Sequence, residues 1–200
     1  MTVISLEARM DLLSECINIG LGRAAESLNR MCGSHVILSA PEIRILNRPC
    51  LTAAASTRCP TVCEGVFLPF IGVMRGMTAL AFAHGDANTL VNALLAAMGM
   101  TSAPEQMRVD TLREVGNVVL VGVLGAMGTV LGLHVEYQPL FTGKDLSPLL
   151  GVADACRTVT LYVRAKFSLE LFLATGEILV VLAEDGFSAL IAALDAKIGE

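Results

Sequence analysis

Two kinds of hydrophobic pattern follow each other along the chain, in the same order in each half. Two long segments, 6–31 and 104–131, and two shorter amphipathic ones, 86–98 and 186–198, predict helices. Runs rich in β-branched and apolar residues predict strands at 36–45, 65–69, 75–83, 135–140, 158–167 and 170–183, with irregular segments at 47–63 and 141–154. The sequence therefore predicts an α/β (α+β) fold in which helices pack on a mainly antiparallel sheet.

The predicted helices carry signals at their ends and glycines in their interiors. Residues typical of helix caps flank the two closing helices: Asp86 and Asp185 at the starts, Gly99 and Gly199 at the ends. An interior glycine costs about 1 kcal/mol relative to alanine, so the glycines of the long helices need a structural reason. The small residues of 22–25 and 122–126 would allow close approach of two backbones. We therefore expect the long helices to lie side by side across a pseudo-two-fold axis.

An internal repeat relates the two halves. Gly33-Ser34-His35-Val36 matches Gly132-Leu133-His134-Val135 at an offset of 99 residues, and the closing helices share glycine, alanine and leucine positions at an offset of 100. The junction is a short turn without a Pro/Ser-rich linker. Halves joined this tightly are expected to share a core. We predict one domain, 1–200, built from repeats of about 1–100 and 101–200.

A polar stripe is copied with the repeat. The pattern D-x3-E-x2-N occurs twice, with an offset of 99 residues at each position: Asp11, Glu15 and Asn18, then Asp110, Glu114 and Asn117. On a helix, positions 0, +4 and +7 fall within an arc of roughly 60°. Other polar positions have changed between the repeats, since Ser14 corresponds to Arg113 and Arg23 to Gly122. The stripes therefore predict two equivalent sites that face solvent.

The residue types in the stripe limit its chemistry. Cys16 lies on a different face and corresponds to Val115, and the spacing suggests no Ser–His or Cys–His pair. An asparagine amide can hold a water molecule through a donor and an acceptor, and a glutamate can bind a cationic group or act as a base. Such a site suits insertion into the active centre of a partner that supplies the metal and the substrate.

Composition narrows the function further. The 200 residues carry 14 basic and 19 acidic side chains, no Trp and 2 Tyr, which argues against nucleic-acid binding. The 54% of hydrophobic residues favours a large core and self-association as a homodimer or another partner surface. Segment 115–133 lacks charge but contains five glycines and Asn117, so we expect a buried helix and no membrane span.

The cysteines and the N-terminus bear on location. The N-terminus has no basic segment followed by an apolar core, so we expect no signal peptide and a cytoplasmic protein with free thiols. Cys59-x3-Cys63 with nearby Cys50 is too loose for a zinc site and no histidine lies close to it, so we expect no metal.

The stripe resembles a family signature. The pattern D/S-x3-E-x2-N-x22-P marks the CheC, CheX and FliY family of response-regulator phosphatases. The first copy matches it in full through Pro41, and the second reaches Pro139 after 21 residues in place of 22. Residue 17 is Ile where the family usually has Gly. The resemblance covers essentially the whole chain, and the two motifs make the chain most similar to CheC.

The resemblance implies dephosphorylation of CheY-type receiver domains in chemotaxis or related two-component signalling. The implied catalytic residues are Glu15, Asn18, Glu114 and Asn117, with Asp11, Asp110, Pro41 and Pro139 in support. Each asparagine would orient the attacking water, and each glutamate would pair with the receiver's phosphate-contacting lysine. No cofactor is expected on this chain, because the Mg²⁺ belongs to the receiver. A CheD-type deamidase is a second implied partner.

Two alternatives stay open. The FliM middle domain has the same fold without this chemistry, so the chain could be a non-catalytic interaction module or a regulator that binds CheD. A metal hydrolase would use the four acids of the stripes, although no histidine ligand accompanies them: Asp11, Glu15, Asp110 and Glu114.

Overall fold

The computed structural model describes residues 4–33, 35–47, 63–83, 85–100, 102–149, 158–169 and 172–199. It confirms the mixed fold with a mainly antiparallel sheet. Its principal helices are α1 (Leu6–Cys32), α3 (Asp86–Ala97), α4 (Glu105–Leu131) and α6 (Glu184–Ile198). Its strands are β1 (Val36–Asn47), β2 (Cys63–Gly72), β3 (Gly76–Ala83), β4 (Val135–Tyr137), β5 (Phe141–Gly143), β6 (Thr158–Leu169) and β7 (Phe172–Ala183).

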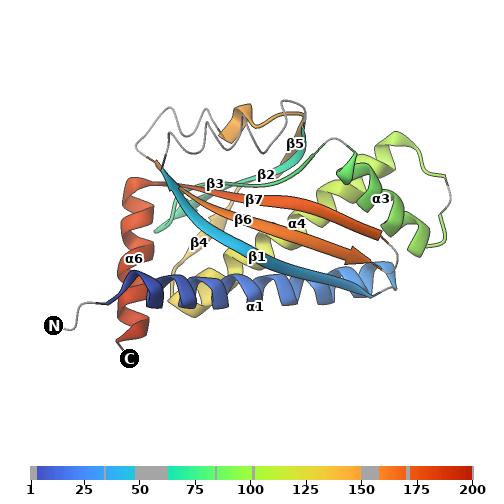
Figure 1. Ribbon diagram of the computed structural model, residues 1–200. Coiled ribbons are helices and arrows are strands. Elements are labelled where there is room, and N and C mark those ends of the chain that lie inside the picture. Colours follow the sequence, from blue (N-terminus) through green and yellow to red (C-terminus); the bar gives the residue numbers. More distant parts are fainter. Residues whose placement is uncertain are drawn as a thin grey trace.

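One sheet contains strands from both halves of the chain. Its order is β1-β6-β7-β3-β2-β4, with β5 also on β2, and every pairing is antiparallel. Strands β1 and β3 of the first half pair with β6 and β7 of the second. Figure 1 shows α1 and α4 against one face of this sheet, with α3 and α6 near opposite ends. The two halves therefore share their backbone hydrogen bonds as well as a core.

Alternation along the strands separates two hydrophobic cores. Val66, Leu80 and Val180 pack in the larger cluster with apolar side chains of all four principal helices. Their neighbours Phe67, Ala79 and Val181 point to the other face and pack in a smaller cluster with Leu146 and Leu149. The helix side of the sheet holds most of the buried apolar surface, and burial of that surface is what fixes α1 and α4.

The predicted contact between the long helices is confirmed, but one predicted glycine does not make it. A Cβ on Gly20 would lie 2.6 Å from the Cα of Val123, and one on Gly122 would lie 2.9 Å from the carbonyl oxygen of Gly20. Gly22 is exposed, and a Cβ there would meet nothing within 4 Å. Gly20 and Gly22 are about 200° apart around the helix, so only one of them can face the partner helix.

Some predicted ends of helices and strands differ from those in the structure. Asp86 and Asp185 lie inside the first turns of α3 and α6, whose N-caps are Gly85 and Ala183. Acidic residues still favour a first turn, because they face the positive end of the helix dipole. The strand expected at 135–140 ends at Tyr137, and β5 forms within the segment expected to be irregular. Most of the irregular segment predicted at 47–63 lies outside the described residues.

Helix α4 is long and apolar enough to span a bilayer by length and composition. Its buried face instead lies in the protein core, where most of these residues belong to the larger hydrophobic cluster and Gly116 adjoins Val66 of the sheet: Leu112, Val115, Gly116, Val119, Leu120, Val123, Leu124, Ala126, Met127 and Leu131. Its apolar content is explained by its place in the core, as the interior glycines predict.

Candidate functional site

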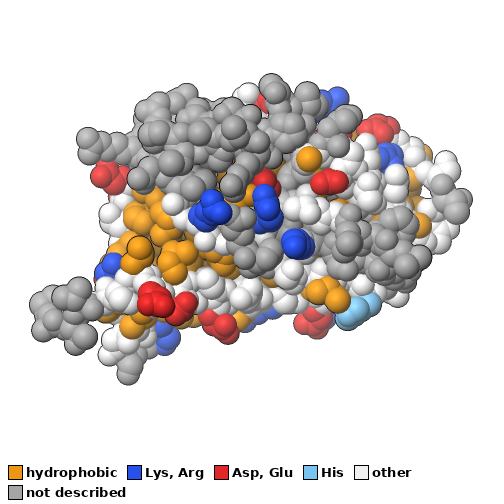
Figure 2. All heavy atoms as spheres, in the orientation of Figure 1, with side chains coloured by type: hydrophobic (Ala, Val, Ile, Leu, Met, Phe, Trp, Pro, Cys, Tyr) orange, Lys and Arg blue, Asp and Glu red, His pale blue; other side chains and the backbone are white. Residues whose placement is uncertain are grey.

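Both predicted stripes lie on exposed helix surfaces. In α1, Asp11, Glu15 and Asn18 are exposed, and the opposite face buries Leu13, Cys16, Ile17 and Gly20. In α4 the same division recurs at the same offset of 99 residues: Asp110, Glu114 and Asn117 are exposed, and Leu112, Val115, Gly116 and Val119 are buried. Figure 2 shows acidic side chains along the edge of the molecule where Figure 1 places α1. The fold therefore offers both stripes to a partner.

The glutamates and asparagines have no internal role in the described structure. Within the described residues, the side chains of Glu15, Asn18, Glu114 and Asn117 make no hydrogen bond or ion pair. Buried polar groups in proteins are nearly always paired, whereas exposed ones can stay free for a ligand. Their two donors and several acceptors are thus available to a docked molecule.

The leading aspartates differ between the stripes. Gln106 donates a hydrogen bond from Nε2 to Oδ1 of Asp110 at 3.0 Å. The residue at the corresponding position before Asp11 is Glu7, whose carboxylate cannot donate when ionised. Asp110 is therefore held by its own helix, and Asp11 is not held in this way.

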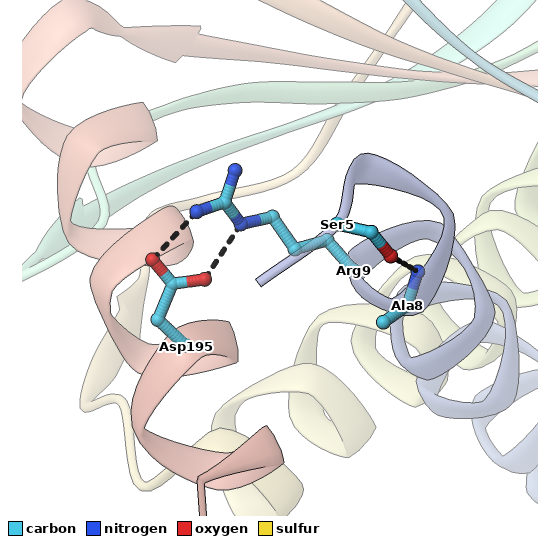
Figure 3. Close-up of polar contacts among 4 residues, drawn as sticks. All are labelled: Ser5, Ala8, Arg9 and Asp195. Carbon is cyan, nitrogen blue, oxygen red and sulfur yellow. Dashed lines mark hydrogen bonds and ion pairs between the residues drawn. The ribbon is translucent and has the colours of Figure 1, made fainter. Parts of the chain in front are cut away.

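A repeated arginine holds the first turn of each long helix. Arg9 donates from Nε to Oδ1 of Asp195 on α6 at 2.6 Å and from Nη2 to Oδ2 at 2.8 Å (Figure 3). Arg108, at the offset of 99 residues, donates to the amide oxygens of Asn88 and Asn92 on α3. Each arginine thus ties a stripe-bearing helix to the closing helix of the other repeat.

These arginines were missed by the sequence analysis, although the signal was present. Arg9 and Arg108 each stand two residues before the first aspartate of a stripe, so the repeated pattern is R-x-D-x3-E-x2-N. Two residues correspond to about 200° around a helix, which places the arginine away from the stripe. The repeated pattern therefore combines an exposed face with an anchor on the opposite side.

Neither a thiol nor a cluster of acids adds covalent or metal chemistry to the stripes. Cys16 is buried, and that burial, with a smaller effect from the Glu15 carboxylate, raises the pKa of its thiol, which disfavours the nucleophilic thiolate. Among the described residues, no three His, Cys, Asp or Glu side chains gather closely enough to hold a metal ion. The four acids of the metal-hydrolase alternative therefore do not form one ligand set.

The two prolines occupy different settings. Pro41 lies in β1 where the pairing with β6 shifts register between Ser39 and Glu42, and its side chain is outside the described set. Pro139 is exposed between β4 and β5. Next to it, the carbonyl oxygen of Leu140 accepts a hydrogen bond from Arg113 Nη2 at 3.4 Å. The second proline thus adjoins a contact to the helix that carries Glu114.

Comparison with solved structures identifies the fold. FliY of Thermotoga maritima superimposes with a TM-score of 0.71 at 17% identity, over 98% of this chain and 100% of that one. The FliM middle domain of H. pylori superimposes with a TM-score of 0.67 at 7% identity, over 95% and 99%. CheX in the CheX–CheY–BeF3–Mg²⁺ complex of Borrelia burgdorferi gives a TM-score of 0.51 at 16% identity, over 82% and 96%.

The chain has the fold of the CheC, CheX and FliY proteins. The resemblance seen in the sequence is thereby confirmed at the level of the fold. No family model matches the sequence. The likeness to FliM extends over nearly the whole chain as well, so this fold alone does not separate an enzyme from an assembly module. The choice depends on the stripes.

Proposed function

We propose that this chain is a phosphatase that removes the aspartyl phosphate from CheY-type receiver domains. The observation that supports the proposal is the pair of exposed Glu–Asn stripes with unpaired side chains, one on each long helix. An exposed polar surface drifts readily where it only contacts water, yet these stripes are identical in a repeat whose neighbouring positions differ. Retention of free acceptors and donors at both copies fits a common catalytic task.

The proposed mechanism relies on positioning. The amide of Asn18 or Asn117 enters the receiver's active site and orients a water molecule in line with the phosphorus. The water oxygen bonds to phosphorus while the bond from phosphorus to the aspartate oxygen breaks. The electron pair of that bond stays on the receiver's carboxylate, and the phosphate leaves with the oxygen and the protons of the water. Glu15 or Glu114 pairs with a receiver lysine and fixes the docked helix. Such positioning and charge stabilisation account for most catalysis of phosphoryl transfer.

The receiver supplies the metal in this mechanism. Mg²⁺ bound by the receiver neutralises charge on the phosphoryl oxygens, and the two helices of this chain contribute only side chains. The CheX–CheY complex with BeF3 and Mg²⁺ shows that a protein of this fold associates with a receiver-type partner. That precedent supports CheY-type receivers as the partner class proposed for this chain.

Phosphate release from a phosphorylated receiver tests the proposal. With Mg²⁺ present, wild type should accelerate release, and the Asn18→Ala/Asn117→Ala variant should lose about a hundredfold or more of that acceleration. Both side chains are exposed, so the variant should keep the wild-type fold and melting temperature. Unchanged turnover in the folded double variant would contradict the proposed role of the asparagines.

A second candidate is a non-catalytic interaction module. The likeness to FliM middle domains, including those in the FliG–FliM and FliM–SpeE complexes of H. pylori, supports it. On this account the chain would bind a receiver or another protein without turnover. Binding of receivers regardless of phosphorylation, with no acceleration of phosphate release for several of them, would favour this candidate.

A further inference from the structure

An apolar hollow lies beside the second stripe, and the proposed mechanism makes no use of its apolar lining. Its volume is about 450 Å³, and its lining includes Met31, Met98, Met107 and Pro104 together with Asp110 and Glu114. The three methionines come from three places: the end of α1, the C-cap of α3 and the first turn of α4. The hollow is open at the surface, since Met98 is 42% exposed and Met107 is 39% exposed.

The lining has the character of a recognition surface. Methionine is unbranched and polarisable, so a methionine-lined surface adapts to apolar side chains of different shape. Apolar anchors in pockets with a polar rim supply most of the binding energy of protein interfaces. Here Asp110 and Glu114 form an acidic rim on the stripe side of the hollow. This arrangement fits an apolar side chain that has basic neighbours.

The position of the hollow indicates which partner would cover it. Glu114 belongs both to the second stripe and to the lining of the hollow. A globular partner that brings a phosphorylated site to Asn117, one helical turn further along, also covers the surface around Glu114. The hollow is therefore continuous with the interface that the proposed function requires, and the partner in question is the receiver domain itself.

The first stripe has no methionine at the three corresponding positions. Ala8 stands where the second repeat has Met107, Val130 where the first has Met31, and Ile198 where the first has Met98. Truncating methionine to alanine removes three heavy atoms of apolar contact surface. The polar residues of the two stripes are alike, whereas the flexible methionines beside the second stripe are replaced by alanine, valine and isoleucine beside the first.

We propose that the methionine hollow receives an apolar side chain of the docked receiver, so that the second stripe binds its partner more tightly than the first. This inference rests on the proposed function, because it takes the receiver as the partner. It adds a specificity-determining surface, formed by Met31, Met98 and Met107, that contacts the partner away from the phosphate.

The test compares polar and apolar replacements at the two exposed methionines. In an Asn18→Ala background only the second stripe turns over, and there Met98→Gln/Met107→Gln should raise the KM for the phosphorylated receiver about tenfold with kcat unchanged. The control Met98→Leu/Met107→Leu keeps the apolar surface and should leave KM within about twofold. Equal melting temperatures of the two variants would establish that both fold.

A binding measurement separates this inference from the proposed catalysis. Titration calorimetry with the receiver carrying beryllofluoride and Mg²⁺ should show two unequal sites on the wild-type chain, with the tighter one weakened by the glutamine pair. Binding unchanged by glutamine, or weakened equally by leucine, would overturn the hollow as an apolar subsite while turnover stands. Weakening by glutamine alone, without turnover in wild type, would support the hollow and overturn the phosphatase. Absence of receiver binding would overturn both.

Discussion

Helices α1 and α4 carry the same exposed pattern on different supports. Both expose Asp, Glu and Asn, bury residues at corresponding positions and hold their first turn with an arginine. Yet α1 has a side-chain cap from Ser5 and a charged Arg9–Asp195 pair to α6, whereas α4 has Pro104 at its N-cap without a side-chain cap. Arg108 bonds to neutral amides of α3 and pairs with Glu105 of its own helix. At matched positions α1 packs Ile17 and α4 packs Gly116, whose absent Cβ would lie 2.4 Å from Val66.

The comparison separates features that differ between the two halves from the one that they share. The buried contacts have diverged, because a core can be rebuilt with different side chains if its volume is kept. The exposed stripe has no packing that would fix its identity, and it is nevertheless the same in both helices. The contrast supports the stripe as the seat of the proposed function and its surroundings as the source of any difference between the two sites.

The largest expected effect comes from the contact between the two helices. Gly20→Ala places a Cβ against the backbone of Val123 and should destabilise the protein by about 1–3 kcal/mol or more, since neither helix backbone can yield cheaply. Gly22→Ala, two residues away and in open space, should stabilise it by about 0.5–1 kcal/mol through helix propensity. Urea unfolding of both variants measures the two changes.

The same two variants test whether α1 and α4 cross closely at Gly20. Both substitutions add the same methyl group to the same helix, so propensity alone predicts equal stabilisation. Similar unfolding free energies for the two variants would contradict the close crossing of α1 and α4 at Gly20.

The next effect concerns the two stripes as separate sites. If each works alone, Asn18→Ala and Asn117→Ala should each retain part of the turnover at saturating receiver, about half if their rates are equal. Because the methionine hollow adjoins the second stripe, Asn117→Ala should leave the site with the higher KM. Steady-state phosphate release at several receiver concentrations measures both quantities. Complete loss in either single variant would show that the stripes act together.

The smallest expected effect is a pH dependence of stability that arises at the Arg9–Asp195 contact and not at the bonds from Arg108 to Asn88 and Asn92. The bond from Arg9 lowers the pKa of Asp195, so this carboxylate contributes stability above its ordinary pKa of about 3.9 and loses it as pH falls through the lowered value. The stability gap between wild type and Asp195→Asn should therefore shrink below about pH 4. The difference in stability between wild type and Asn88→Ala, which removes an amide that Arg108 binds, should not change with the protonation of Asp195. A pH series of urea midpoints distinguishes the two.

Much of the fold could be predicted because the helices and strands have long, clear patterns. The predicted helix at 6–31 corresponds to α1, and the predicted strands at 75–83 and 158–167 correspond to β3 and β6. Local sequence signals did not predict the features that depend on tertiary contacts. The observed N-caps are Gly85 and Ala183 in place of the predicted Asp86 and Asp185. Strand β5 forms in a segment predicted to be irregular because it pairs with β2. Which glycine faces the partner helix depends on helix rotation, which the presence of glycine does not reveal.

The candidate site also has parts that the sequence could predict and parts that it could not. The stripes could be predicted because their residues lie within one helix each, where spacing determines the shared face. Arg108 binds residues of α3, and the hollow joins Met31, Met98 and Met107 across about 75 residues of sequence. The repeated arginine itself is visible in the sequence, but its partners and the three methionines come together through the packing of helices that are distant along the chain, which a pattern within one helix does not contain.

Phosphate release with four proteins side by side tests whether Asn18 and Asn117 carry the proposed phosphatase activity. Wild type, the Asn18→Ala and Asn117→Ala single variants and their double variant are mixed with a phosphorylated CheY-type receiver and Mg²⁺. We expect full acceleration by wild type, partial acceleration by each single variant and none by the folded double variant. Equal acceleration by wild type and the double variant would contradict it, as would no acceleration by wild type with any of several receivers.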